Sequence, residues 1–282
     1  MPSTNFYFGR LNFKHQLTSL DDFSEDLSRA ERIKRALLSY IQTDGPVFTQ
    51  ENGNIEWVFG VCYEEGDYLL GKFGKVYPNR PTRYDYDRGE FIEENEEGTQ
   101  ADYSMFLIYP EENLIVFNQR QNIGYRQFQQ AFSAGYNKHL GLDDALNIGL
   151  LQDTRAVEDL ISESQVMYAT FDLVPTNPTS DPDMQVLDNH IQNMEADSFN
   201  MSVQTDGGIN MDDDLMQAAL NMSTAGYGNF ELEYEQDDRV ERYKSANRPA
   251  AQEIDRPSTL DDLYGAASDL IDRAHELIHS DD

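Results

Sequence analysis

Residues 165–200 constrain the fold more than any other stretch, because a strand, a proline-rich corner and an amphipathic helix follow one another there. The segment QVMYATFDLV, 165–174, carries apolar side chains at both alternating sets of positions, which is typical of an interior strand. Pro175 and Pro178 end the strand, since proline cannot donate to a sheet ladder, and Pro182 suits the first turn of a helix. The predicted buried stripe of that helix is Met184, Leu187, Ile191 and Met194.

The rest of the periodicity predicts an α+β fold, in which a mixed, mainly antiparallel sheet has helices packed chiefly on one face. Alternating segments predict strands at 4–13, 55–61, 68–77, 103–109, 114–118 and 229–235. A long polar excursion, punctuated by Pro and Gly, occupies residues 78–102. We expect one α+β domain over residues 1–244, a linker at 245–257 and a C-terminal amphipathic helix at 258–282.

The C-terminal helix has an apolar stripe that could dock back on the chain, pair with its own copy or bind a partner. The residues predicted to form this partner-binding stripe are Leu260, Leu263, Leu270, Ile271, Leu277 and Ile278.

Net charge is the strongest compositional signal, since 21 basic residues stand against 52 acidic residues, for a formal charge of −31. Residues 145–282 carry −22 of this charge, which disfavours generic binding of duplex nucleic acid by the C-terminal half. Such acidity is expected either of a salt-rich, halophilic cytoplasm or of a surface that meets a basic partner or mimics nucleic acid.

Three further features limit the class of protein. No run of about 18 apolar residues occurs, so we expect no membrane span. The first residues lack a basic segment followed by an apolar one, so we expect no secretory signal and a cytoplasmic location. Cys62 is the only cysteine, which excludes an internal disulfide and a thiolate metal cluster.

Motifs of catalysis are weak or absent. The string HELIH at 275–279 matches a zinc-protease helix, but no downstream ligand follows it. No phosphate-binding glycine loop and no G-x-S-x-G nucleophile motif occurs. The sequence therefore identifies no catalytic residue, no metal ligand and no cofactor, and it favours a non-catalytic protein.

A local basic patch interrupts the acidity. Basic side chains interleave with tyrosines over residues 72–88, an arrangement that can grip a single nucleic-acid strand by charge and stacking. The predicted contacts are Lys72, Lys75, Arg80, Arg83, Tyr84 and Arg88. The alternative is a loop that pairs with the acidic run at 93–97 of the same excursion.

Several segments resemble a prokaryotic family, domain of unknown function forty-seven forty-seven. The resemblance rests on NFYFGRLNF, YLLGKFGKVY, MFLIYPEENLIVF, FDLVPTNPTSDPD and AGYGNFELE. It spans residues 4–245, leaves out the C-terminal helix and assigns no site residue. It implies a setting in phage defence or in a mobile element.

These observations favour a cytoplasmic interaction or assembly subunit whose acidic surface meets a basic protein partner, or which forms a homo-oligomer. The alternative is a subunit that binds or processes nucleic acid through the 72–88 patch. Salt-dependent binding of single-stranded nucleic acid distinguishes the two.

Overall fold

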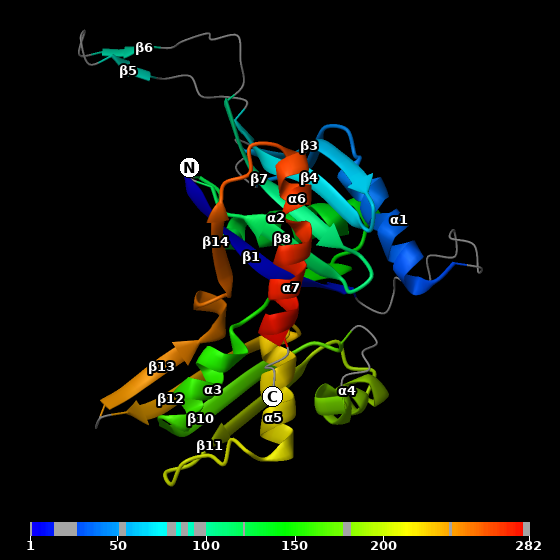
Figure 1. Cartoon of the computed structure of the whole chain (residues 1–282). Coiled ribbons are helices and arrows are strands. Elements are labelled where there is room, and N and C mark those ends of the chain that lie inside the picture. The colour runs from blue at the N-terminus through cyan, green and yellow to red at the C-terminus, as the bar shows by residue number, and fades with distance from the viewer. Residues whose placement is uncertain are drawn as a thin grey trace.

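The computed structural model of the chain describes residues 2–13, 27–50, 55–77, 83–85, 90–92, 100–120, 122–176, 182–236 and 239–278. These residues form an eight-stranded sheet, a four-stranded sheet and a short two-stranded pair, with helices packed on the two larger sheets (Figure 1). The predicted α+β class is confirmed. Every pairing between described strands is antiparallel.

The first sheet is built around its long N-terminal strand. Seven strands lie side by side in the order β14 (Ala251–Asp255), β1 (Ser3–Phe13), β8 (Leu114–Asn118), β7 (Gln100–Tyr109), β4 (Tyr68–Tyr77), β3 (Glu56–Glu65) and β2 (Pro46–Thr49). The eighth strand, β9 (Leu146–Leu150), pairs with residues 9–13 of β1, whereas β14 pairs with residues 3–7. Because β8 pairs along the other edge of β1, β9 and β14 follow one another along the same edge.

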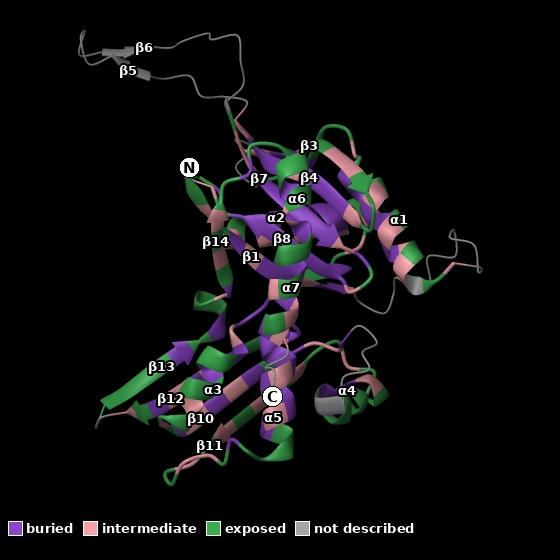
Figure 2. Ribbon diagram, viewed as in Figure 1, coloured by how far each residue is buried: buried purple, intermediate pink, exposed green. Residues whose placement is uncertain are grey.

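Helices cover both faces of the first sheet, because its interior strands are apolar on both sides. One face packs against α1 (Arg29–Ile41) and α2 (Tyr125–Leu140), around rings that include Trp57, Phe73 and Phe132. The opposite face packs against α6 (Leu260–Gly265) and α7 (Ala267–Ile278) (Figure 2). None of the described helices is long and apolar enough to cross a membrane.

The second sheet has the strand order β11 (Phe199–Gln204), β10 (Gln165–Leu173), β12 (Gly228–Gln236) and β13 (Arg239–Lys244). β10 is an interior strand, as its apolar pattern predicts. Its core side packs against α3 (Thr154–Ser162), α4 (Pro182–Asn193) and α5 (Asp214–Thr224). The other side is polar, so on this sheet the helices occupy one face.

The corner between β10 and α4 is held by a buried carboxylate. Asp188 is 4 % exposed and accepts hydrogen bonds from Thr176 N (2.8 Å), Thr176 Oγ1 (2.6 Å) and Gln192 Nε2 (2.6 Å). α4 begins at Pro182, as predicted, and buries three of the four predicted stripe residues. Met194 is 56 % exposed instead, because the helix already ends at Asn193.

Close backbone contact joins the two sheets. A Cβ atom on Gly149 of β9 would lie 1.8 Å from the carbonyl oxygen of Gly226, which follows α5 and has φ +85°. Asn12 Nδ2 of β1 donates to that same carbonyl at 2.8 Å. At the far end of α7, Thr154 Oγ1 donates to Leu277 O at 2.8 Å. The first two contacts join β9 and β1 to the turn after α5, and the third joins the end of α7 to the start of α3.

Residues 245–257 differ from the predicted linker. They contain a short 3₁₀ turn, Ser245–Asn247, and then β14, which pairs with five residues of β1. This strand could not be predicted from the sequence because its side chains are mostly polar, as is common for an edge strand. In the 78–102 excursion, β5 (Arg83–Asp85) pairs with β6 (Glu90–Ile92), and most of the remainder lies outside the described residues.

Candidate functional site

The apolar stripe predicted to bind a partner is buried within the chain itself. Leu260, Leu263, Leu270, Ile271 and Leu277 are at most 6 % exposed. Ile278 is partly buried against the cores of both sheets. Of the three alternatives that the sequence leaves open, the structure therefore shows docking on the same chain. What α6 and α7 present to solvent is their acidic side.

The predicted basic patch is divided between the two faces of the first sheet. Lys75 is 4 % exposed, and its ammonium group donates to Asn122 O (2.6 Å) and Gln127 Oε1 (2.8 Å). Burial lowers the pKa of Lys75, and the nearby Asp102 carboxylate partly offsets this effect. Lys72 lies on the other face, with Nζ 4.9 Å from the centroid of the Tyr103 ring.

The other predicted nucleic-acid contacts cannot be placed beside these lysines. The backbone of Arg83 and Tyr84 belongs to β5, but their side chains lie outside the described residues, as do Arg80 and Arg88 entirely. Because Lys72 and Lys75 lie on opposite faces of the first sheet, they do not form one surface.

A different surface gathers acidic and aromatic side chains from three places in the chain. The β3–β4 hairpin, the β7–β8 turn and the C-terminal helices meet there, because α6 packs across β4 and β7. We define the acidic–tyrosine surface as Tyr63, Glu65, Asp67, Tyr68, Tyr109, Glu111, Glu112, Asp261, Tyr264 and Asp272.

Three tyrosine rings form the aromatic part of this surface. Tyr68 lies 5.6 Å from Tyr109 and 6.2 Å from Tyr264, measured between ring centroids. Tyr264 is 40 % exposed on the solvent side of α6. The group therefore presents an aromatic edge to solvent beside its carboxylates.

Hydrogen bonds attach two phenols to the surrounding carboxylates. Tyr63 donates to Asp261 Oδ1 at 3.0 Å, which links β3 to α6. Tyr109 donates to Glu111 Oε2 at 3.0 Å. Burial, together with the Glu111, Glu112 and Asp67 carboxylates, raises the pKa of Tyr109 to about 12.

The carboxylates of this surface are mostly without cationic partners. Glu112 Oε2 lies 2.7 Å from His275 Nε2, a hydrogen bond that becomes an ion pair when the histidine is protonated. The other five, Glu65, Asp67, Glu111, Asp261 and Asp272, form no ion pair with any described residue. The surface therefore combines uncompensated negative charge with exposed aromatic edges.

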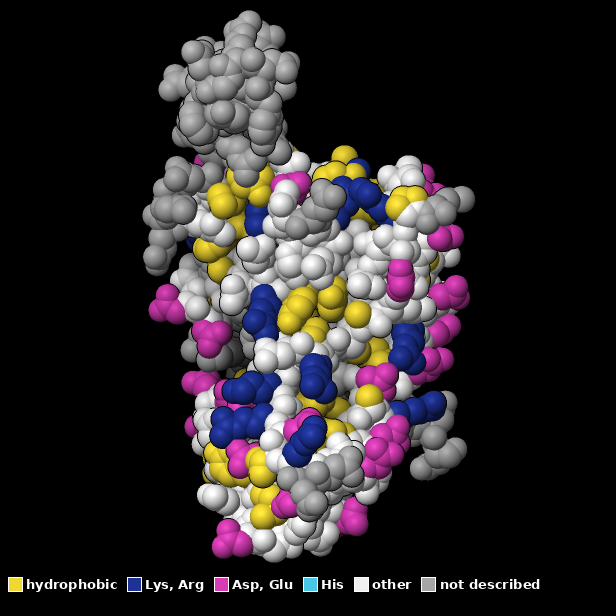
Figure 3. Space-filling model, turned by 90° about the vertical axis from the view of Figure 1, so that its left-hand side faces the viewer, with side chains coloured by type: hydrophobic (Ala, Val, Ile, Leu, Met, Phe, Trp, Pro, Cys, Tyr) yellow, Lys and Arg dark blue, Asp and Glu magenta, His cyan; other side chains and the backbone are white. Residues whose placement is uncertain are grey.

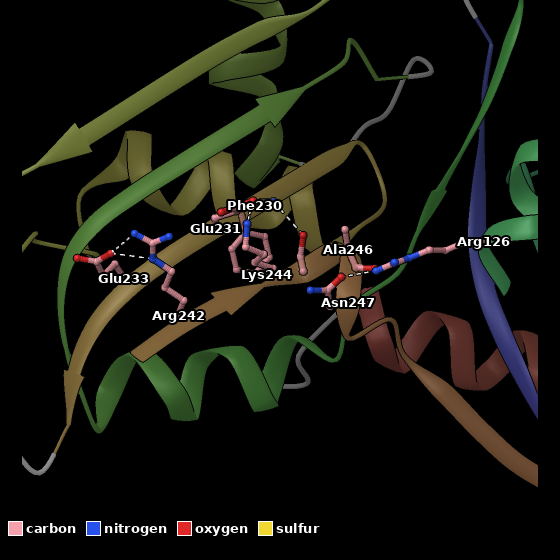
Figure 4. Close-up of polar contacts among 9 residues, drawn as sticks. Arg126, Phe230, Glu231, Glu233, Arg242, Lys244, Ala246 and Asn247 are labelled. Atoms are coloured by element: carbon pink, nitrogen blue, oxygen red, sulfur yellow. Dashed lines mark hydrogen bonds and ion pairs between the residues drawn. The ribbon is translucent and has the colours of Figure 1, made fainter. Parts of the chain in front are cut away.

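The uncovered face of the second sheet is different, since its charges neutralise one another. Arg242 pairs with Glu233 at 2.9 Å and Lys244 pairs with Glu231 at 2.7 Å across β12 and β13 (Figure 4). Basic and acidic side chains are also interspersed over the lower part of the molecule when it is viewed from the side (Figure 3). This ladder contributes to sheet pairing and leaves little net charge for a partner.

The described residues contain no group of three His, Cys, Asp or Glu side chains placed to hold a metal ion. Within the HELIH match, His275 is paired with Glu112, Glu276 is paired with Arg273 at 2.9 Å, and His279 lies outside the described residues.

Sequence reasoning missed the acidic–tyrosine surface because its parts are far apart in the chain. The hairpin at 64–67 and the turn at 110–113 are visible as polar turns, and polar turns are usually only solvated. The two turns and α6 come together only because α6 packs across β4 and β7. The one available signal is the alternation of tyrosines with acids at both turns.

Comparison with known proteins now adds one finding to this geometry. A search of curated proteins found no match. The family model for Domain of unknown function (DUF4747) matches residues 4–272, so it extends beyond the predicted resemblance through β14 and α6 into α7. The chain therefore belongs to the family described as Domain of unknown function (DUF4747).

Proposed function

We propose that this chain is a non-catalytic interaction subunit that binds a basic protein partner through the acidic–tyrosine surface. The observation that carries the proposal is the group of five carboxylates, without described ion-pair partners, placed around Tyr63, Tyr68 and Tyr109. On β12 and β13, by contrast, Glu231 and Glu233 are paired with Lys244 and Arg242.

The chemistry of this surface suits arginine better than lysine. A guanidinium group can stack on a tyrosine ring while its N–H groups donate to a carboxylate, whereas an ammonium group is a compact point charge. Tyr68 and Tyr109 stand next to Asp67 and Glu111, so both interactions are available at the same place. We therefore expect an arginine-rich segment as the partner's contact.

The test is a titration with a labelled arginine-rich peptide, followed by fluorescence anisotropy across a salt series. The variant Asp67→Asn/Glu111→Gln/Asp272→Asn removes one charge from each of the three contributing elements. Exposed charge pairs are worth about 0.2–1 kcal/mol each, so we expect the loss of three to weaken binding by roughly three- to a hundred-fold.

The matched control is Asp172→Asn/Asp206→Asn/Glu235→Gln, which removes three exposed carboxylates from the second half of the chain. It changes the net charge equally, and we expect its affinity to stay within about twofold of the wild type. An equal loss in both variants would show that only the overall charge attracts the peptide. If a lysine-rich peptide bound as tightly as the arginine-rich peptide, stacking of guanidinium groups on the tyrosines would not contribute to recognition.

We also propose a setting in phage defence or in a mobile element, as the sequence resemblance implies, and plating efficiency of phage on strains with and without the gene tests it. Binding of nucleic acid through the 72–88 patch has less support, because Lys75 is buried on the face opposite Lys72. The acidic–tyrosine surface is therefore the first target for experiment.

A further inference from the structure

Two basic side chains lie against one tyrosine ring, further along the strands that carry the acidic–tyrosine surface. Lys72 Nζ of β4 lies 4.9 Å from the centroid of the Tyr103 ring, and Arg120 Cζ lies 4.0 Å from it. The charge of a third basic residue, Arg256 after β14, also helps to lower the pKa of the Tyr103 phenol. We call Lys72, Tyr103, Arg120 and Arg256 the cationic cluster.

The backbone holds these groups in place before any ligand arrives. Lys72 lies within β4, which is paired on both edges by β3 and β7. Arg120 N donates to Ile123 O at 3.2 Å, and Arg120 O accepts from Ile123 N at 2.9 Å. Arg256 N donates to Pro2 O at 3.0 Å. Little ordering of the backbone is therefore needed for the cluster to bind.

The charges of the cluster are not neutralised by ion pairs with described residues, although Arg256 also lines a hollow that contains Asp255, Asp262 and Asp269. None of its three cations forms an ion pair with a described carboxylate. Arg120 Nε is buried and has no hydrogen-bond partner among the described atoms. Burial raises the pKa of Tyr103, but Arg120, Lys72 and Arg256 together bring it below the usual value. Like charges held this close repel one another, and a bound anion would remove the repulsion.

We infer that the cationic cluster is a binding site for the phosphate group of a ligand. Arginine donors match phosphate oxygens in geometry as well as in charge, and a lysine adds a point charge. The Tyr103 ring already contacts two cations, so charge on the phosphate, rather than stacking of a base, provides recognition. The site is separate from the acidic–tyrosine surface and does not depend on the proposed protein partner.

The test is calorimetric titration of the full chain with pyrophosphate, together with the thermal unfolding midpoint at each concentration. We expect saturable binding and a rising midpoint, since a ligand of the folded state stabilises it. The variant Lys72→Gln/Arg120→Gln should bind about tenfold or more weakly, because it removes two charged donors that hydrogen-bond the phosphate.

The matched control is Arg242→Gln/Lys244→Gln, which removes two exposed cations from β13 and should leave the affinity within about twofold. A short single-stranded oligothymidylate that competes with pyrophosphate would identify a nucleic-acid backbone as the source of the phosphate, and one that does not compete would identify a small polyphosphate.

Two results would overturn the inference. The first is the absence of saturable heat with the wild type, and the second is an equal loss in the control variant.

Discussion

Replacing Leu263 by alanine tests whether the C-terminal helices stabilise the chain from within. Leu263 has no exposed surface and packs in the core between α6 and the first sheet, beside residues such as Leu70 and Leu107. Leucine-to-alanine changes at such positions cost about 2.7–5 kcal/mol, because transfer energy is lost and a cavity remains. We expect Leu263→Ala to lower the free energy of unfolding in urea by about 3–4 kcal/mol.

The next residue provides the matched control. Tyr264 is 40 % exposed and lies on the solvent side of the same helix, with its ring 6.2 Å from that of Tyr68. Tyr264→Ala should cost at most about 1 kcal/mol of stability, since little buried surface is lost. Tyr264→Ala should still weaken binding of the arginine-rich peptide.

The contrast between Leu263 and Tyr264 decides whether the apolar side of α6 belongs to the chain's own core. If Leu263→Ala changed stability by less than about 1 kcal/mol but changed the molecular mass in solution, the stripe would serve association instead of the chain's own core. A large loss of stability in Tyr264→Ala would likewise contradict the burial of α6.

Four other predictions follow from individual contacts. Gly149→Ala should destabilise the chain by several kcal/mol in urea unfolding, since the new Cβ would lie 1.8 Å from Gly226 O. Gly207→Ala is the control and should leave stability unchanged, because its Cβ would meet only Thr205 Oγ1, at 3.9 Å. Asp188→Ala should cost about 2–4 kcal/mol by the same measurement, because it leaves buried donors at the corner unpaired. Folding raises the pKa of Tyr109 to about 12, above its ordinary value near 10. The protonated phenol therefore stabilises the fold fully below about pH 10, and this contribution is lost as the pH rises through 12. Tyr109→Phe should flatten this alkaline decline in the midpoint of urea unfolding. Stability should increase with KCl, because a formal charge of −31 repels itself, and a thermal midpoint independent of salt would contradict this.

The parts of the fold that local chemistry controls could be predicted from the sequence. The interior strand β10 and the start of α4 at Pro182 follow from apolar patterning and from proline's missing N–H. The limit of such reasoning is visible at Met194, which continues the helical spacing but lies beyond the end of the helix and is exposed.

Features that depend on distant partners could not be predicted. β14 has the composition of a linker, and only its pairing with β1 makes it a strand. Lys72 and Lys75 are close in sequence, yet alternation along β4 places them on opposite faces. The acidic–tyrosine surface and the cationic cluster both join residues from separate turns and strands, and no local signal specifies that meeting.

Hydrogen–deuterium exchange with and without the arginine-rich peptide tests binding at the acidic–tyrosine surface, because it locates the contact without any substitution. We expect slower exchange in three separate segments, 63–68, 109–112 and 261–272, which meet only in the folded chain. Protection confined to the second sheet, at β10 to β13, or spread evenly over all acidic segments would contradict it.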